Sequence, residues 1–109
     1  MFISHYVSDQ PILALTQRLL GQTSEPCVFQ KGEYTYRYYG SGIAPQAHPH
    51  THPEAHFLRR TGCGACQSPD VLVLMLDVQI NHRNGDVCYT LEVQCQTCRT
   101  YTAVLHDDA

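Results

Sequence analysis

The sequence predicts a mostly β protein of the α+β class, in which a C-terminal antiparallel sheet carries an N-terminal helix and hairpin. Apolar side chains alternate with a period of two along residues 71–81 and 86–94, which is typical of half-buried strands. Asn84-Gly85 joins these two runs and is a strong signal for a β-hairpin. A C-x-x-C pair flanks the hairpin on each side, so the hairpin would bring the two pairs together.

Length and composition indicate one globular domain. The chain has 109 residues, of which 43% are hydrophobic and 16% charged, as in ordinary folded proteins. We divide it into a helix-plus-hairpin section (1–44), a His/Pro-rich loop (45–55) and a cysteine-bearing section (56–109). The first section is expected to pack on the last, because a helix and a hairpin alone would be marginally stable.

The N-terminal section begins with a predicted helix over residues 9–20. Ser8 or Asp9 can cap it, Pro11 falls in its first turn, and Gly21 can end it. The apolar residues recur at helical spacing, so we expect this face to lie on the sheet: Ile12, Leu13, Leu15, Leu19 and Leu20.

A first hairpin is expected after the helix. Its strands are residues 27–30 and 33–39, joined by a turn at Lys31-Gly32. Alternation places three tyrosines on one face of the second strand: Tyr34, Tyr36 and Tyr38.

The cysteine-bearing section is expected to hold four strands. Short strands over 56–61 and 99–105 precede and follow the cysteine pairs. Strict alternation along 71–81 predicts one continuously apolar face, made of Leu72, Leu74, Leu76, Val78 and Ile80. The other face would begin apolar and turn polar: Val71, Val73, Met75, Asp77 and Gln79.

Four cysteines have the spacing of a metal site. Two residues between cysteines allow a tight turn to aim both thiolates at one ion, with Gly62 and Gly64 supplying the backbone freedom. Four thiolates close a tetrahedral shell, which predicts one structural Zn²⁺ with no open position for substrate. The predicted ligands are Cys63, Cys66, Cys95 and Cys98. Cys27 and Cys88 fall in predicted strands, where we interpret them as small hydrophobic residues.

Other uses of the cysteine pairs are disfavoured by context. The N-terminus lacks the basic start of a signal peptide, and no apolar run is long enough to cross a membrane. We therefore expect an intracellular, reducing compartment, where disulfides are rare. A redox-active pair is less expected than a shared site, and iron, which suits the same ligands, stays an alternative.

The order of a pair, a hairpin, a pair and a strand resembles the zinc-ribbon class over residues 57–106. The sequence departs from common ribbons because Gln67 and Arg99, not glycines, follow the pairs, and because the strands are long. The resemblance implies a structural zinc. It also implies nucleic-acid-binding or transcription-associated work as one function.

Four histidines cluster between the two sections. His48, His50, His52 and His56 lie within nine residues, and such a tract is a candidate second metal site. The favoured interpretation is a solvated loop whose histidines protonate near pH 6.

His50-Thr51-His52-Pro53 resembles the core motif of JAMM-type zinc isopeptidases. The resemblance implies His50 and His52 as ligands and Glu33 as general base, but the downstream Ser-x-x-Asp of that family is absent. A helical metalloprotease motif also fails, because Pro53 stands where that motif needs Glu. A metal-dependent hydrolase is therefore the least favoured function.

The favoured function is a non-catalytic, zinc-stabilised protein-interaction module, as a small component of a larger assembly such as a viral particle. Tyrosine suits protein interfaces, so Tyr34, Tyr36 and Tyr38 are candidate partner contacts, although packing on the helix explains them equally well. Arg59, Arg60 and Arg99 are further candidate partner contacts. The alternative is nucleic-acid binding through a patch formed by Arg59, Arg60, Arg83 and Arg99 with Tyr101. The net charge of −3 disfavours strong binding to phosphate backbones.

Overall fold

The computed structural model describes residues 2–19, 27–40, 45, 47–56, 58 and 60–108. Predictions that concern Leu20, Gly21, Arg59 and the loop at 22–26 lie outside the described residues. No helix in the described part of the chain is long and apolar enough to cross a membrane.

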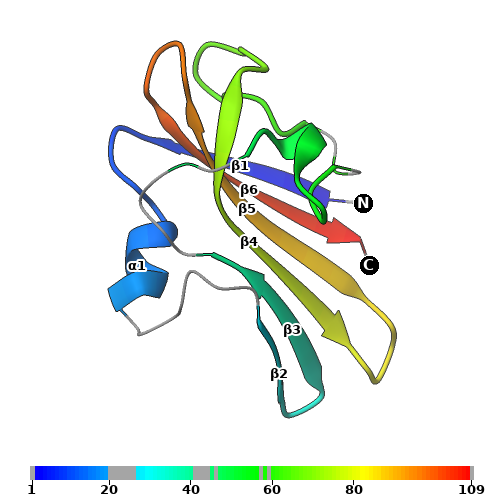
Figure 1. Cartoon of the computed structure of the whole chain (residues 1–109). Coiled ribbons are helices and arrows are strands. Elements are labelled where there is room, and N and C mark those ends of the chain that lie inside the picture. Colours follow the sequence, from blue (N-terminus) through cyan, green and yellow to red (C-terminus); the bar gives the residue numbers. More distant parts are fainter. Residues whose placement is uncertain are drawn as a thin grey trace.

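One six-stranded antiparallel sheet dominates the protein, in the order β1-β6-β5-β4-β3-β2 (Figure 1). The mostly β prediction is therefore confirmed. The hairpin of β2 and β3 does not pack on a separate ribbon, because β3 pairs with β4 and extends the same sheet. The elements are β1 (Phe2–Ser8), α1 (Ala14–Leu19), β2 (Cys27–Lys31), β3 (Tyr34–Tyr39), the 3₁₀ turn η1 (Pro49–Thr51), β4 (Val71–Asn81), β5 (Val87–Cys95) and β6 (Tyr101–Asp108).

The first strand was not expected from the sequence. β1 pairs with β6 from Phe2↔Asp107 to Ser8↔Tyr101, so the two ends of the described chain meet at one edge of the sheet (Figure 1). This pairing joins residues about one chain length apart, which local sequence patterns do not report.

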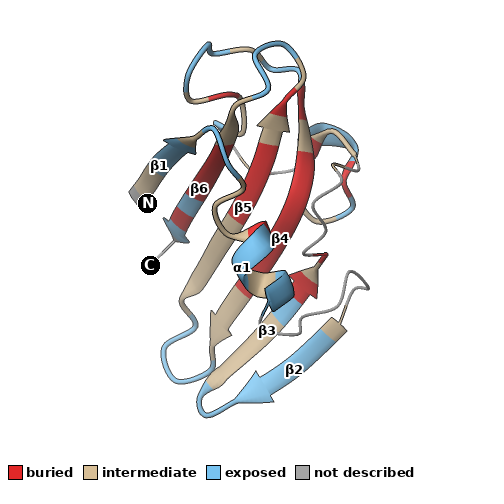
Figure 2. Cartoon of the chain, turned by 90° about the vertical axis from the view of Figure 1, so that its left-hand side faces the viewer, coloured by how far each residue is buried: buried red, intermediate tan, exposed pale blue. Residues whose placement is uncertain are grey.

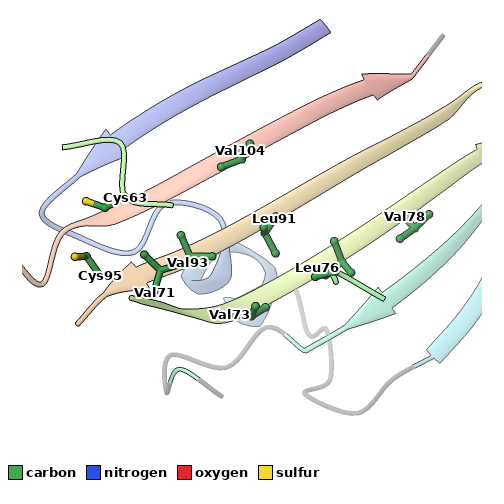
Figure 3. Packing of buried hydrophobic residues seen from close by; sticks show 10 residues of the cluster. Cys63, Val71, Val73, Leu76, Val78, Leu91, Val93, Cys95 and Val104 are labelled. Carbon is green, nitrogen blue, oxygen red and sulfur yellow. The ribbon is translucent and has the colours of Figure 1, made fainter. Parts of the chain in front are cut away.

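A β-bulge in β4 makes the strict-alternation prediction wrong. The register shifts between Val73 and Met75, so Leu74 is an extra residue on the bulged strand. Leu74 and Met75 therefore join one core cluster. The other cluster takes Val71, Val73, Leu76 and Val78 from the same strand. This second cluster lies on the face covered by the segment around η1, and Figure 3 shows its valines and leucines along β4, β5 and β6.

The helix is shorter than predicted and turns a different face to the sheet. It begins at Ala14 because the Glu92 carboxylate on β5 accepts the N–H groups of Ile12, Leu13 and Ala14, at 2.8, 2.7 and 3.0 Å. These N–H groups have no partner within a helix, and a buried acid from the sheet serves them instead. Ala14 is buried, whereas Leu15 and Leu19 are exposed, Leu19 to 79%, so the expected apolar face is wrong at Leu15 and Leu19.

Turns and short elements also differ in detail. The turn of the first hairpin is Gly32-Glu33, one residue later than predicted, since Lys31 pairs with Tyr34. The described residues within 56–61 form no strand; the N–H of Leu58 instead bonds the carbonyl of Ala55 in a turn. α1 lies against one face of the sheet and the segment around η1 against the other (Figures 1 and 2).

Candidate metal centre

The four predicted cysteines meet at one end of the sheet. The sulfur atoms of Cys63, Cys66, Cys95 and Cys98 all lie within 4.8 Å of one another. The first cysteine of each pair is buried and the second is exposed. Figure 3 shows Cys63 and Cys95 with their sulfurs close together beyond the last valines of the core. Among the described residues, this is the one group of three or more such side chains with metal-binding geometry.

The spacing of the sulfurs fits a tetrahedral ion. A shell with metal–sulfur distances of about 2.3 Å places neighbouring sulfurs about 3.8 Å apart. Cys63 and Cys98 are separated by 3.6 Å between sulfurs, as are Cys66 and Cys95. A disulfide would need about 2.05 Å, and all six cysteines are free. The donor set is therefore that of a metal centre, with the soft ligands that zinc and iron share.

Two loops of the same construction hold the sulfurs. In the first, the Cys63 sulfur accepts N–H groups from Ala65 and Cys66 at 3.3 and 3.4 Å. In the second, the Cys95 sulfur accepts those of Thr97 and Cys98 at the same two distances. Such bonds stabilise thiolates, so both loops are shaped to hold charged ligands. We call these loops the first and second knuckles (residues 63–68 and 95–100).

The left-handed backbone positions of the two knuckles are not occupied by glycines. Gln67 and Arg99, which follow the pairs, adopt left-handed backbone with φ of 65° and 63°. Their N–H groups bond the carbonyls of Cys63 and Cys95, both at 3.1 Å. These are the positions where common ribbons have glycine, and here non-glycine residues accept the strain. The prediction that Gly62 and Gly64 supply the conformational freedom is wrong, since neither is left-handed.

Gly64 is needed for space. A Cβ added there would lie 2.7 Å from Cγ2 of Val7 and 3.3 Å from Cγ2 of Thr102. The Gly64 N–H also donates to the Thr102 hydroxyl at 3.1 Å. The first knuckle is thus pressed onto β1 and β6, which fixes the position of Cys63.

Hydrogen bonding sets the proton affinities of the sulfurs. The side chain and the N–H of Thr100 lower the pKa of Cys98 to about 6. The N–H of Ser68 acts to lower the pKa of Cys66, but hydrogen bonds with the neighbouring cysteines and burial raise it to about 12. Burial acts to raise the pKa of Cys95, yet the N–H groups of Cys98 and Thr97 leave it lowered. Hydrogen bonding thus favours the thiolate forms of Cys98 and Cys95, and metal binding would release the proton of any ligand that is still protonated.

The histidines contact each other in pairs, and among the described residues no three of them have metal-binding geometry. The rings of His48 and His50 lie 5.4 Å apart between centroids. His48 pairs with Asp70 at 2.9 Å. His52 is 8% exposed, and its Nδ1 accepts the N–H groups of Glu54 and Ala55. Burial lowers the pKa of His52, so this ring is a neutral acceptor within its own turn. His56 contacts the His52 carbonyl through Nδ1 at 3.2 Å.

The residues of the isopeptidase resemblance are also apart. Glu33 lies in the β2–β3 turn, where its carbonyl accepts the N–H of His82, at the end of β4 away from the cysteines. His50 instead lines a groove of about 740 Å³ beside the first knuckle, together with His5 and Arg60. Glu33 therefore does not lie beside His50, so it is not placed to be the general base that the resemblance implied.

Other predicted site residues fall in three places. Tyr38 is buried in the core under α1, whereas Tyr34 and Tyr36 remain half-buried on the β2–β3 hairpin. Arg99 is exposed at the second knuckle and donates to Gln96. Cys88 bonds Asp107 and Cys27 packs in the core under α1, so both lie outside the metal cluster.

Sequence reasoning missed Glu92 and Asp77 as buried acids. Their sequence signal is an acid between apolar neighbours in a strand, and alternation alone predicts an exposed side chain at such a position.

Comparisons of the chain with protein-family models, with curated proteins and with solved structures found no match.

Proposed function

We propose that the chain is a non-catalytic protein-interaction module whose fold is held by one structural Zn²⁺. The closed four-sulfur shell carries this proposal. Four protein ligands fill a tetrahedral ion, so no position remains for a substrate or an activated water. The two knuckles have the same hydrogen-bond pattern and lie on either side of the β4–β5 hairpin. A shared ion would therefore join parts of the chain that are distant in sequence.

The proposed partner surface is the hairpin surface, defined as the edge of the β2–β3 hairpin with Phe29, Tyr34 and Tyr36 on one face and Val28 on the other. β2 is the last strand in the sheet order, and an edge strand can pair with a strand of another protein. Val28 is 65% exposed and Phe29 39%. The rings of Phe29 and Tyr36 stack at 4.9 Å, which presents a rigid aromatic platform of the kind found at interfaces.

Charge favours a protein partner over a nucleic acid. The chain carries seven basic and ten acidic residues, and the exposed Arg60 and Arg99 lie at the knuckles, away from the hairpin surface. Phosphate backbones are bound by clustered basic residues. We therefore expect only weak binding to DNA or RNA.

The test is partner capture from cells of the source, quantified for three forms of the chain. Val28→Asp with Phe29→Asp should abolish capture of proteins that the wild-type chain enriches, while Leu19→Asp, a matched exposed change on α1, should leave capture intact. Native mass spectrometry should give one zinc per chain for all three forms. Capture that survives the hairpin change but not the Leu19 change would contradict the hairpin surface. Two metals per chain, one lost on His50→Ala, would contradict the non-catalytic assignment.

A further inference from the structure

The face of the sheet that carries α1 holds a groove of about 450 Å³ beside the helix. Its walls are mostly apolar and come from the helix side (Ile12, Leu13) and from strands (Tyr6, Met75, Leu105). Asp77 lies in its floor, next to Gln79 and Thr90. We call this hollow the Asp77 groove. It is distinct from both the metal centre and the hairpin surface.

The floor carboxylate is incompletely bonded. Asp77 is 9% exposed, and its Oδ2 accepts one long hydrogen bond, from the Gln79 side chain at 3.3 Å. Its Oδ1 is buried and has no hydrogen-bond partner among the described residues. A buried carboxylate without donors is costly, and this burial raises the pKa of Asp77.

Glu92 is a second buried acid in the same sheet, and its carboxylate has the hydrogen-bond donors that Asp77 lacks. Glu92 pairs with Met75 in the ladder, beside Asp77, which pairs with Thr90. It is fully buried, yet three backbone N–H groups occupy its two oxygens. The fold thus satisfies one acid with its own helix and leaves the neighbouring acid short of donors. Among the described residues that line the Asp77 groove, none is basic.

We propose that the Asp77 groove binds an organic cation, with an ammonium or guanidinium group at Asp77 and an alkyl stem along Met75 and Leu105. The cation supplies the missing donors and the charge partner, while the apolar walls take the stem. Tyr6 is 55% exposed at the rim, where its ring can contact the cation. The ligand is either the side chain of lysine or arginine in a protein segment or a free alkylamine. This site stands independently of the hairpin surface.

The test is an NMR titration of the zinc-loaded protein with four probes: acetyl-lysine methylamide, acetyl-arginine methylamide, butylammonium and the neutral acetyl-norleucine methylamide. The cations should shift the amide signals of residues 77, 79, 90 and 105, with affinities at least about tenfold above that of the norleucine probe, as expected for a charge-assisted hydrogen bond. Tighter binding of the capped amino acids than of butylammonium identifies a protein side chain as the ligand. The reverse order identifies a free amine.

Two variants complete the test. Asp77→Asn should reduce cation affinity at least about tenfold. The amide keeps the shape of the aspartate side chain without its charge, and burial already disfavours the anion at this position. Asp86→Asn, at a half-buried acid in the β4–β5 loop that does not line the groove, should leave the affinity unchanged. If Asp77→Asn does not fold, Tyr6→Ala at the rim should still weaken cation binding several-fold. Equal affinity for norleucine and lysine probes, or no shifts in the groove with any cation, would overturn the proposal.

Discussion

The two ends of the sheet are stabilised in different ways. At the cysteine end, β4, β5 and β6 are buried, and two knuckles are tied to them by sulfur and threonine contacts. At the hairpin end, β4 and β5 are mostly half-buried and β2 is largely exposed (Figure 2). That end is held by ladder hydrogen bonds and by the stacked rings of Phe29 and Tyr36. Buried core residues and knuckle contacts are therefore concentrated at the end of the sheet away from the proposed partner surface.

The largest effect should come from breaking the metal shell. Cys63→Ser removes a buried ligand and should cost several kcal/mol of folding free energy, because metal binding in such sites is coupled to folding. Circular dichroism with native mass spectrometry should show loss of the ion together with loss of folded structure. Cys88→Ser, which changes a thiol outside the cluster, is the control and should keep both. A Cys63→Ser protein that kept its metal and its stability would contradict the assignment.

The second prediction compares the stability cost of a glycine-to-alanine substitution at each end of the sheet. Gly64→Ala should cost about 1–3 kcal/mol, because the added methyl overlaps Val7 and Thr102 in a packed region. Gly32→Ala at the hairpin end meets no atom within 4 Å but has φ of 62°, so it should cost only about 1 kcal/mol, from backbone strain. Urea denaturation midpoints measure both. Equal costs would show that the first knuckle is not pressed onto the sheet.

Acid should weaken the fold through buried histidines. Burial and the nearby His5 lower the pKa of His106, so below about pH 6.5 the unfolded chain takes up a proton that the folded chain does not. Stability is therefore fully present at neutral pH and falls as pH drops below this value. Urea unfolding of the metal-loaded protein at pH 7.5 and 5.5 should show a smaller loss for His106→Leu than for wild type, by at most about 1.4 kcal/mol for one pH unit. The exposed His50→Leu should keep the full loss; an unchanged loss in His106→Leu would contradict this origin.

The smallest expected effect is a gain in folding stability from a substitution in the second knuckle. Arg99→Gly relieves left-handed strain of about 1–2 kcal/mol but adds freedom to the unfolded chain, for a net stabilisation of about 0.5 kcal/mol. Arg83→Gly, in the β4–β5 loop without left-handed backbone, should instead be neutral or slightly destabilising. Thermal unfolding of the zinc-loaded forms measures the difference. A loss of stability in Arg99→Gly would mean that the arginine side chain contributes more than its backbone strain costs.

The sequence predicted best what depends on neighbouring residues. The bounds of β4 and β5 differ from prediction by at most one residue, because Asn84-Gly85 and the flanking alternation act locally. The four cysteines were identified from spacing alone. What failed depends on distant partners. β1 needs β6 to become a strand, and α1 begins where Glu92, 78 residues beyond Ala14, accepts its N–H groups. The bulge at Leu74 is hidden because both faces of β4 are apolar around it.

The pairing of β1 with β6 has a consequence for the timing of folding. On a ribosome, β1 leaves the exit tunnel well before β6, so it has no partner while the intervening strands emerge. Until β1 and β6 pair, the first knuckle lacks the surface of Val7 and Thr102 against which Gly64 packs. We therefore expect β1 to dock late, closing the sheet after the β4–β5 hairpin has formed.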